Sequence, residues 1–296
     1  MRIVYVVPAP MGRTPEGAAE MARRGELLRE YAAPGTEVDI IDVPQGPASI
    51  ESMYEEYISI PATAQRVLDA EEQGYDAAIV GCFGDPGLDA FRELTDMLVV
   101  GPGESSFLAA AMLGHSFSVV TVTASVIAST KREVRNAGVG DKLASVRVVE
   151  TPVLELAQDR GATLEKLAAE GRKALEADGA DTLVLGCMTM GFLGVAEELS
   201  QRLGVPVVNP SLWCLKMAEA MAGAGYSHSK KAYMTPPKVA LGLVSSKRDL
   251  LVSHSGSLNR GDAEGAEKGG KKVGSPPPQK PQCSLRLCGE MPEFVG

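Results

Sequence analysis

The sequence predicts an α/β protein of two pseudo-symmetric Rossmann-like lobes, each a four-stranded parallel sheet flanked by helices, with a functional site in the cleft between the lobes. Short apolar runs alternate with longer stretches of helical periodicity, which is the pattern of β-α-β units. The apolar runs of the second half also repeat those of the first half in the same order, which indicates a duplicated unit. With 45% hydrophobic and 23% charged residues, the chain has the composition of a globular protein.

Eight strand-like runs alternate with these helical stretches: residues 2–7, 36–42, 76–82 and 97–101 in the first half, and 117–123, 144–150, 181–187 and 205–209 in the second. The third runs of the two halves are the most alike, because both begin at an aspartate and both end in Gly-Cys, at Cys82 and Cys187. Two unrelated α/β domains would share the alternation of strands and helices but not these matching ends, so we favour duplication.

Helices are predicted between the strands over residues 16–31, 62–73, 163–177, 196–203 and 212–222. Gly74 and Gly179 have the position of helix stops before the two strands that end in cysteine. The last helix carries a largely apolar face. We expect it to return to the first lobe, because a second crossing would hold the two halves in register.

The domain organisation follows from these elements. The first lobe is predicted to comprise residues 1–102 plus 210–238, and the second lobe residues 103–209. Residues 239–296 form a tail whose greater part is rich in Gly, Ser, Pro and Lys, with almost no hydrophobic periodicity. Such a segment cannot bury enough apolar surface to offset the entropy of ordering, so the sequence predicts that the tail is disordered.

Charge and cysteine content argue against several classes of protein. The formal net charge of −9 disfavours binding to nucleic-acid phosphates. The first apolar run is too short for a signal sequence or a membrane-spanning helix, so we expect no membrane association. Five cysteines at wide spacing form no disulfide framework, which predicts reduced thiols and a cytoplasmic location. Assembly into a homo-oligomer stays open.

Cys82 and Cys187 are the candidate catalytic residues. Open parallel sheets bind ligands beyond the carboxyl ends of their strands, and both cysteines lie at such ends. If the lobes face each other, one thiol lies on each side of a bound substrate, which suits removal of a proton from one face of a carbon atom and its return to the other. One cysteine at a strand end is most often a packed free thiol, whereas two at matching ends favour an active site.

The residues after each cysteine are expected to favour a thiolate. Asp85 and Pro86 have the pattern of a helix N-cap and first turn, whose free N–H groups and positive dipole end would stabilise a thiolate or a substrate oxyanion. After Cys187, Thr189 adds a hydroxyl. A thiol with a pKa of about 8.5 is a workable base near neutral pH where its surroundings favour the thiolate.

The segments around these cysteines resemble a known family. The run 81–90 (Gly-Cys-Phe-Gly-Asp-Pro-Gly-Leu-Asp-Ala), with segments 46–51, 99–101, 117–121 and 185–188, resembles the aspartate/glutamate/hydantoin racemases, and the hydantoin racemases in particular, over about residues 2–238. The resemblance implies catalysis by Cys82 and Cys187 without a cofactor or a metal. It also implies a small-molecule substrate, a cyclic ureide or an amino-acid-like compound.

The substrate-binding residues are expected in five places. The resemblance implies backbone N–H groups directly after the first cysteine, a loop after the second strand, and a threonine at the end of the fifth strand. Residues after the second cysteine and in the turn after the last strand are expected to border the same pocket. The residues are Pro47, Ser49, Ile50, Phe83, Gly84, Thr121, Met188, Thr189 and Asn209.

Two turns depart from the family pattern. Members of the family usually end the first strand in Asn-Pro-Asn, whereas this chain has Val7-Pro8-Ala9-Pro10. They often end the last strand in an aspartate, whereas this chain has Asn209. Because both turns should border the pocket, we expect the substituent of the substrate to differ from that of a typical hydantoin.

The predicted activity is cofactor-independent racemisation at the C5 centre of a 5-substituted hydantoin, or of allantoin, by two-cysteine 1,1-proton transfer. The enzymatic alternative is an aspartate/glutamate-type racemase or a maleate-isomerase-like enzyme, although amino-acid racemases tend to carry Cys-Asn-Thr where this chain has Cys82-Phe83-Gly84. A ligand-binding sensor on the same scaffold would bind the ring without exchanging its proton. A redox pair would need the two sulfur atoms within disulfide reach.

Other polar residues give weaker signals. No Gly-x-Gly-x-x-Gly turn follows the first strand, which disfavours a nicotinamide cofactor, and no lysine lies at a strand end, which disfavours a Schiff base. His115 and His228 are expected in a loop and on the surface. Glu104 either lines the crevice or caps the next helix.

Overall fold

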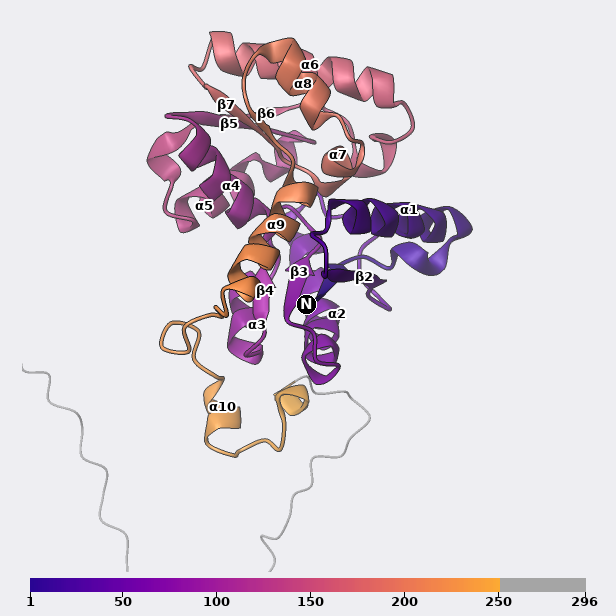
Figure 1. The fold of residues 1–296 in the computed structure, drawn as a ribbon, viewed down its shortest axis with the longest axis vertical. Helices are drawn as coiled ribbons and strands as arrows, with labels where there is room; N and C mark the ends of the chain where they lie inside the picture. The colour runs from indigo at the N-terminus through magenta and orange to yellow at the C-terminus, as the bar shows by residue number, and fades with distance from the viewer. Residues whose placement is uncertain (251–296) are drawn as a thin grey trace, which may run out of the picture. The chain divides into compact units, whose positions relative to one another are not determined.

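The computed structural model describes residues 1–250, which contain two four-stranded parallel sheets flanked by helices (Figure 1). The strand orders are β2-β1-β3-β4 and β6-β5-β7-β8, so the two sheets have the same topology. Each strand overlaps one predicted apolar run, and the predicted fold class is confirmed. The strands are β1 (Arg2–Val7), β2 (Glu37–Asp42), β3 (Ala77–Val80), β4 (Leu98–Val100), β5 (Phe117–Thr121), β6 (Leu143–Val148), β7 (Thr182–Leu185) and β8 (Val207–Val208).

The strand register places the two cysteines at equivalent points. Val6 of β1 pairs with Val80 of β3, and in the other sheet Val120 of β5 pairs with Leu185 of β7. These four central strands are almost wholly buried, as expected of parallel strands covered by helices on both faces. Because β3 and β7 each stop two residues before a cysteine, both thiols lie just beyond the carboxyl edge of their sheet.

Helices connect the strands, and α1, α6, α8 and α9 lie close to the predicted ranges. Polar side chains cap several of them: Thr14 accepts an N–H at the start of α1, Asp159 at the start of α6 and Asn209 at the start of α9. The helices are α1 (Pro15–Tyr31), α2 (Met53–Glu72), α3 (Leu88–Leu94), α4 (Pro102–Leu113), α5 (Ile127–Asn136), α6 (Arg160–Glu176), α7 (Met188–Phe192), α8 (Ala196–Leu203), α9 (Pro210–Gly223) and α10 (Pro237–Ala240).

The helix α2 begins well before its predicted start at residue 62. Pro61 interrupts the sequence pattern, because proline lacks the N–H that a helix interior needs. The structure nevertheless continues the helix through Pro61 and starts it after Ser52, whose hydroxyl accepts the N–H of Glu55. The local N-cap and the burial of Ala62, Ala64 and Val67 against the sheet therefore outweigh the proline.

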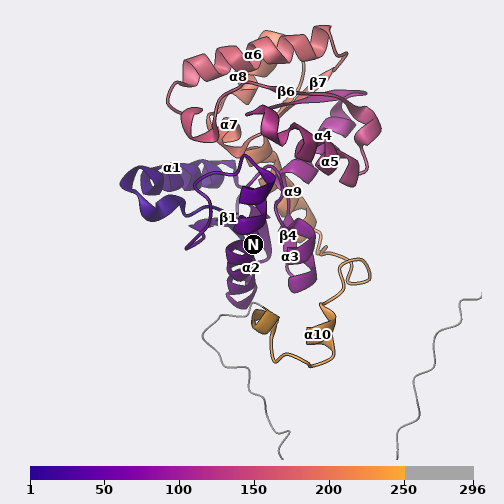
Figure 2. The ribbon, with the colours of Figure 1, turned by 180° about the vertical axis from the view of Figure 1, so that it is seen from behind.

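One apolar core joins the two sheets. It contains Tyr5 and Phe83 from the first half and Phe117 and Phe192 from the second. The helix α9 contacts β3 and β4 of the first sheet as well as α4 and α7, and both views show it beginning where the two halves meet and running alongside the first sheet (Figure 2). The division of the chain into lobes at residues 102 and 210 stays a prediction, because this core is continuous across it.

The predicted disordered tail begins at residue 239, and the structure differs for its first part. A 3₁₀ helix covers Lys247–Leu250. The Lys247 ammonium lies 3.0 Å from the Glu71 carboxylate of α2, and the Arg248 guanidinium lies 2.7 Å from that of Asp69. Ion pairs join this segment to α2. A prediction based on hydrophobic periodicity cannot detect such pairs, because it considers only the spacing of apolar residues. The remainder of the predicted tail, 251–296, lies outside the described residues.

Candidate active site

Cys82 and Cys187 each come directly after a glycine whose N–H makes the last inter-strand hydrogen bond of its strand. The Gly81 N–H donates to the Val6 carbonyl at 2.7 Å, and the Gly186 N–H donates to the Val120 carbonyl at 2.8 Å. Cys82 is partly exposed and Cys187 is buried, and both are free thiols. The structure thus places the two predicted catalytic residues at matching strand ends.

Backbone N–H groups face both sulfur atoms, but burial dominates their pKa values. Burial raises the pKa of Cys82 to about 12, and the Gly84 N–H opposes the rise. Burial also raises the pKa of Cys187, opposed by the N–H groups of Met190 and Thr189. The N–H groups after each cysteine do lower its pKa, as expected. The expectation that these segments favour a thiolate is nevertheless wrong, because desolvation of the charged form raises each pKa by more than the N–H groups lower it.

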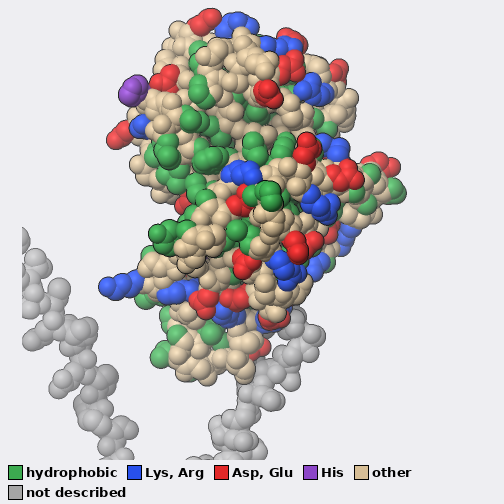
Figure 3. Space-filling view, in the orientation of Figure 1, with side chains coloured by type: hydrophobic (Ala, Val, Ile, Leu, Met, Phe, Trp, Pro, Cys, Tyr) green, Lys and Arg blue, Asp and Glu red, His purple; other side chains and the backbone are tan. Residues whose placement is uncertain are grey.

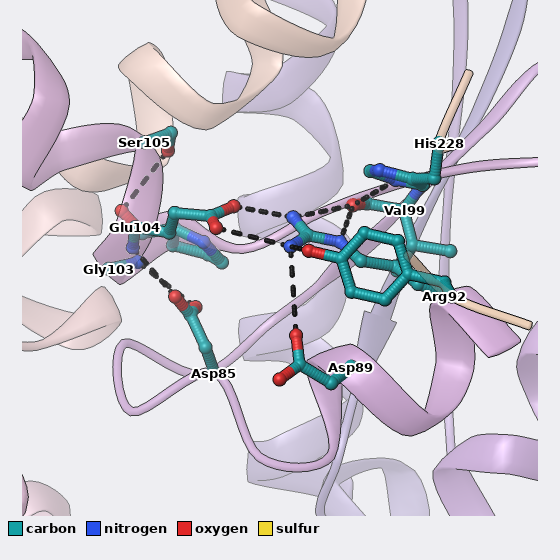
Figure 4. A network of polar contacts seen from close by, with 10 residues as sticks. Asp85, Asp89, Arg92, Val99, Gly103, Glu104, Ser105 and His228 are labelled. Atoms are coloured by element: carbon teal, nitrogen blue, oxygen red, sulfur yellow. Dashed lines mark hydrogen bonds and ion pairs between the residues drawn. The ribbon is translucent and has the colours of Figure 1, made fainter. Parts of the chain in front are cut away.

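The turn after Cys82 differs from the prediction. Asp85 is not an N-cap, because α3 begins at Leu88 after Gly87, and Asp85 itself adopts the left-handed conformation with φ of 49°. Its carboxylate instead accepts the N–H of Gly103 at 3.0 Å and of Glu104 at 2.6 Å, and so caps α4 (Figure 4). A β-carbon at Gly103 would lie 2.2 Å from the Phe83 carbonyl oxygen, so glycine permits this close approach.

A buried ion-pair network holds this turn against β4 (Figure 4). The Arg92 guanidinium pairs with the Glu104 carboxylate and donates to the Val99 carbonyl at 3.3 Å. The His228 ring accepts the Val99 N–H at 2.9 Å, and burial lowers its pKa, so this histidine is neutral near pH 7. His228 is half-buried rather than superficial, and Glu104 is an ion-pair partner in the first turn of α4.

Cys187 has a cationic neighbour that comes from the other half of the chain. Arg24 of α1 is 5% exposed and donates to the Thr189 hydroxyl at 3.1 Å, while its guanidinium lies 4.9 Å from the centre of the Phe192 ring. Besides the burial that raises it and the N–H groups that lower it, the Cys187 pKa is lowered by the Arg24 charge. Sequence reasoning missed Arg24. The available signal was its helical spacing from the buried Leu28.

The loop after β2 lies between the two halves. Pro47 is buried, and Ser49 and Ile50 are partly buried. The Glu51 carbonyl at its end accepts the Ser125 hydroxyl at 2.6 Å, and the Glu51 carboxylate accepts the N–H of Val153. The loop is thereby fixed to the second half by Glu51, a residue that sequence reasoning did not include among the contacts.

The remaining predicted site residues use their polar atoms within the protein. The Thr121 hydroxyl donates to the Gly186 carbonyl at 2.9 Å, and the Asn209 amide donates to the Gly191 carbonyl at 3.1 Å. Phe83 and Met188 are buried in the core shared by the two sheets. Thr121 and Asn209 therefore fix the backbone on either side of Cys187.

Two cavities of the described residues have linings that do not include the thiols. One of about 600 Å³ is lined by residues of α4, α8 and α9 and by the Asn209 turn, with exposed apolar side chains such as Met112 at its edge, and Figure 3 shows hydrophobic side chains exposed over α4. A second of about 470 Å³ is lined by polar residues that include Glu56, Asp85 and Arg132. Neither lining includes Cys82 or Cys187, so cavity size does not locate the thiols.

Among residues 1–250, no helix is both long and apolar enough to cross a membrane. Within the same residues, no three His, Cys, Asp or Glu side chains come together in a way that could hold a metal ion.

Comparison with known proteins identifies the class. The family model "Asp/Glu/Hydantoin racemase" matches residues 14–218, so the chain belongs to this family, and it is accordingly an isomerase of the racemase type. It is 38% identical over 224 residues to a hydantoin racemase of Pseudomonas sp. (strain NS671), covering 75% of this chain and 86% of that protein. A hydantoin racemase of Paenarthrobacter aurescens is 35% identical, with 80% and 98% covered.

Solved structures of racemases have the same fold as this chain. The crystal structure of allantoin racemase from Pseudomonas fluorescens superposes with a TM-score of 0.74 at 33% identity, covering 80% of this chain and 97% of that chain. Allantoin racemase from Klebsiella pneumoniae gives a TM-score of 0.73 at 30% identity, with 80% and 94% covered. Glutamate racemase from Francisella tularensis, at 17% identity and a TM-score of 0.56, shares the fold.

Proposed function

We propose that this racemase inverts the C5 centre of a 5-substituted hydantoin, or of allantoin, by two-base proton transfer between Cys82 and Cys187, with no cofactor. The observation that carries the proposal is the pair of free thiols at equivalent ends of two sheets of like topology. The similarity to hydantoin racemases in sequence and to allantoin racemases in structure supports the choice of a cyclic ureide.

In the proposed reaction, C5 of the substrate loses a proton to one cysteine and gains a proton from the other. One cysteine, as a thiolate, removes the proton from C5, and the electron pair moves onto the adjacent carbonyl oxygen to give an enolate. The opposite cysteine, as a thiol, delivers a proton to the other face of C5. A raised pKa lowers the fraction of thiolate but makes each thiolate a stronger base, which suits abstraction from a carbon acid.

The proposed substrate contacts lie on both halves. We assign ring contacts to the loop holding Pro47, Ser49 and Ile50 and to the backbone after each cysteine. Thr121 and Asn209 act less directly, because their polar atoms hold the backbone around Cys187. The proposed residues are Pro47, Ser49, Ile50, Phe83, Gly84, Thr121, Met188, Thr189 and Asn209.

Polarimetry on single enantiomers tests the proposal. Purified full-length protein is incubated with 5-alkyl hydantoins, with allantoin and with aspartate or glutamate, in the absence of added pyridoxal phosphate and metal. We expect loss of optical rotation with a hydantoin or allantoin and none with the amino acids. Racemisation of the amino acids alone contradicts the substrate class, and ring binding without loss of rotation indicates a sensor.

A further inference from the structure

Tyr5 is a buried polar residue to which the proposed mechanism gives no role. It lies in the middle of β1 and is 0% exposed. Among the described residues, its hydroxyl is one of two buried side-chain polar atoms without a hydrogen-bond partner, the other being that of Ser106. A buried hydroxyl without a partner costs free energy of desolvation that phenylalanine, of nearly the same shape, would avoid.

The ring of Tyr5 points toward the carboxyl ends of the strands. Tyr5 pairs with Ile79 in the sheet, but a β-carbon at Gly81 would lie 2.5 Å from its Cε1 atom and 2.8 Å from its Cζ atom. The hydroxyl end of the ring thus lies beside the residue that precedes Cys82. Glycine at position 81 is what leaves room for it.

The other side of the ring meets the second half of the molecule. Tyr5 packs edge-to-face on Phe192 of α7, with ring centres 5.8 Å apart. Because α7 is the helix that begins directly after Cys187, the Tyr5 ring connects the two segments that carry the thiols. The ring is therefore held at the junction of the two halves, between Gly81, which precedes Cys82, and the helix that begins after Cys187.

The groups around the hydroxyl leave it as a neutral donor. Burial raises the Tyr5 pKa well above its usual value, and the charges of Cys214, Arg24, Cys82 and Cys187 also act on it. Arg24 already donates to Glu20 and Thr189, and the Cys214 thiol donates to the Ser211 carbonyl at 3.5 Å. Among the described residues no atom accepts this O–H, so it is free to donate to an acceptor that a bound substrate would bring.

We propose that the Tyr5 hydroxyl is a catalytic hydrogen-bond donor to the substrate carbonyl oxygen next to C5, the atom that becomes the enolate oxygen. This assignment rests on the proposed function, because it places C5 between Cys82 and Cys187. A donor held between the two segments that carry the thiols is suited to the carbonyl attached to the carbon between those thiols. Such a bond strengthens as negative charge develops, so it lowers the barrier more than it tightens binding.

The variant Tyr5→Phe tests the assignment. We expect kcat to fall by about 100-fold, the scale of loss of one oxyanion donor, with KM nearly unchanged. The loss should be alike for allantoin and for a 5-alkyl hydantoin, since both share the ring carbonyl. Ser106→Ala removes the other unpartnered buried hydroxyl and is the matched control, with kcat expected to stay near the wild-type value.

A second measurement uses the wild-type protein and does not depend on the folding of the variant. A 4-thiohydantoin replaces the carbonyl oxygen next to C5 with sulfur, which is a poorer hydrogen-bond acceptor but also makes the C5 proton more acidic. The enzymatic rate of each substrate is therefore divided by its base-catalysed rate of racemisation in solution, and this ratio should be lower for the 4-thiohydantoin than for the matching hydantoin. Wild-type kcat in Tyr5→Phe, or equal ratios for the two substrates in the wild-type protein, overturns the Tyr5 assignment alone. Failure of the wild-type protein to racemise any hydantoin or allantoin overturns the proposed function and this assignment together.

Discussion

The two halves of the molecule place a cysteine at the same point of the same topology, yet they surround the two sulfur atoms with opposite charge. Burial raises both pKa values. Near Cys82 the charges of Cys187, Asp85 and Glu56 add to that rise, whereas near Cys187 the Arg24 guanidinium opposes it. Duplication accounts for the equivalent positions of the thiols, and a residue from the opposite half makes them chemically unequal. We infer that Cys187 loses its proton at a lower pH than Cys82, so that Cys187 is the thiol that forms a thiolate more readily.

The largest expected effect comes from removing either thiol. Cys82→Ser and Cys187→Ser should each lower kcat/KM by about 1,000-fold, because a serine hydroxyl is a far weaker acid and base near neutral pH. Cys214→Ala removes a thiol buried in α9 and serves as the control that keeps its activity. Racemisation at the wild-type rate in either serine variant rules out the two-base mechanism.

Removing the Arg24 charge should have the next largest effect. With Arg24→Met the thiolate of Cys187 loses its cationic neighbour, so the rise of kcat/KM with pH should move to higher pH and the rate at pH 7 should fall roughly 10-fold. Arg23→Met is the matched control, since Arg23 also pairs with Glu20 but is much more exposed. An unchanged pH profile in Arg24→Met shows that the guanidinium does not set the state of Cys187.

The pH dependence of thiol labelling tests the inequality in the unmodified protein. A thiol with a raised pKa becomes a thiolate only as the pH rises, and the Cys82 pKa is raised to about 12. Between pH 7 and 10, iodoacetamide should therefore label Cys187 ahead of Cys82, although Cys187 is the more buried of the two. Peptide mass spectrometry gives the order, and labelling of Cys82 first shows that exposure rather than charge controls reactivity.

The smallest effect concerns stability. Asp85→Ala removes the acceptor of two N–H groups at the start of α4 and should lower the free energy of unfolding by about 1–2 kcal/mol. Asp159→Ala removes the ordinary N-cap of α6 in the second half, and we expect a loss of about 1 kcal/mol or less, because Asp159 is exposed. Urea unfolding measures both, and an equal or smaller loss for Asp85→Ala argues against its role in fixing the turn after Cys82.

The fold was predictable because local patterns dictate it. Every strand lies within or overlaps a predicted strand-like run, and the Gly-Cys ends at Cys82 and Cys187 mark the third strand of each half. The start of α2 was not predictable from periodicity, because Pro61 interrupts it. The left-handed conformation of Asp85 depends on its bonds to a helix that follows much later in the chain.

The candidate site was predictable only in part. The positions of the cysteines follow from the repeat, but the charge around them depends on contacts between residues far apart in sequence. Arg24 reaches Thr189 across the two halves, and the Tyr5 ring meets Phe192 in the same way. The sequence of α1 or β1 alone does not indicate which distant residue each of these side chains contacts.

Deuterium incorporation during a single inversion tests the central claim most directly. One enantiomer of a 5-alkyl hydantoin is incubated with the wild-type protein in heavy water, and both enantiomers are separated and analysed by NMR at low conversion. Two thiols on opposite faces predict deuterium at C5 of the inverted product and almost none in the recovered substrate. Equal deuterium in product and recovered substrate, or inversion without uptake of deuterium, contradicts proton transfer between Cys82 and Cys187.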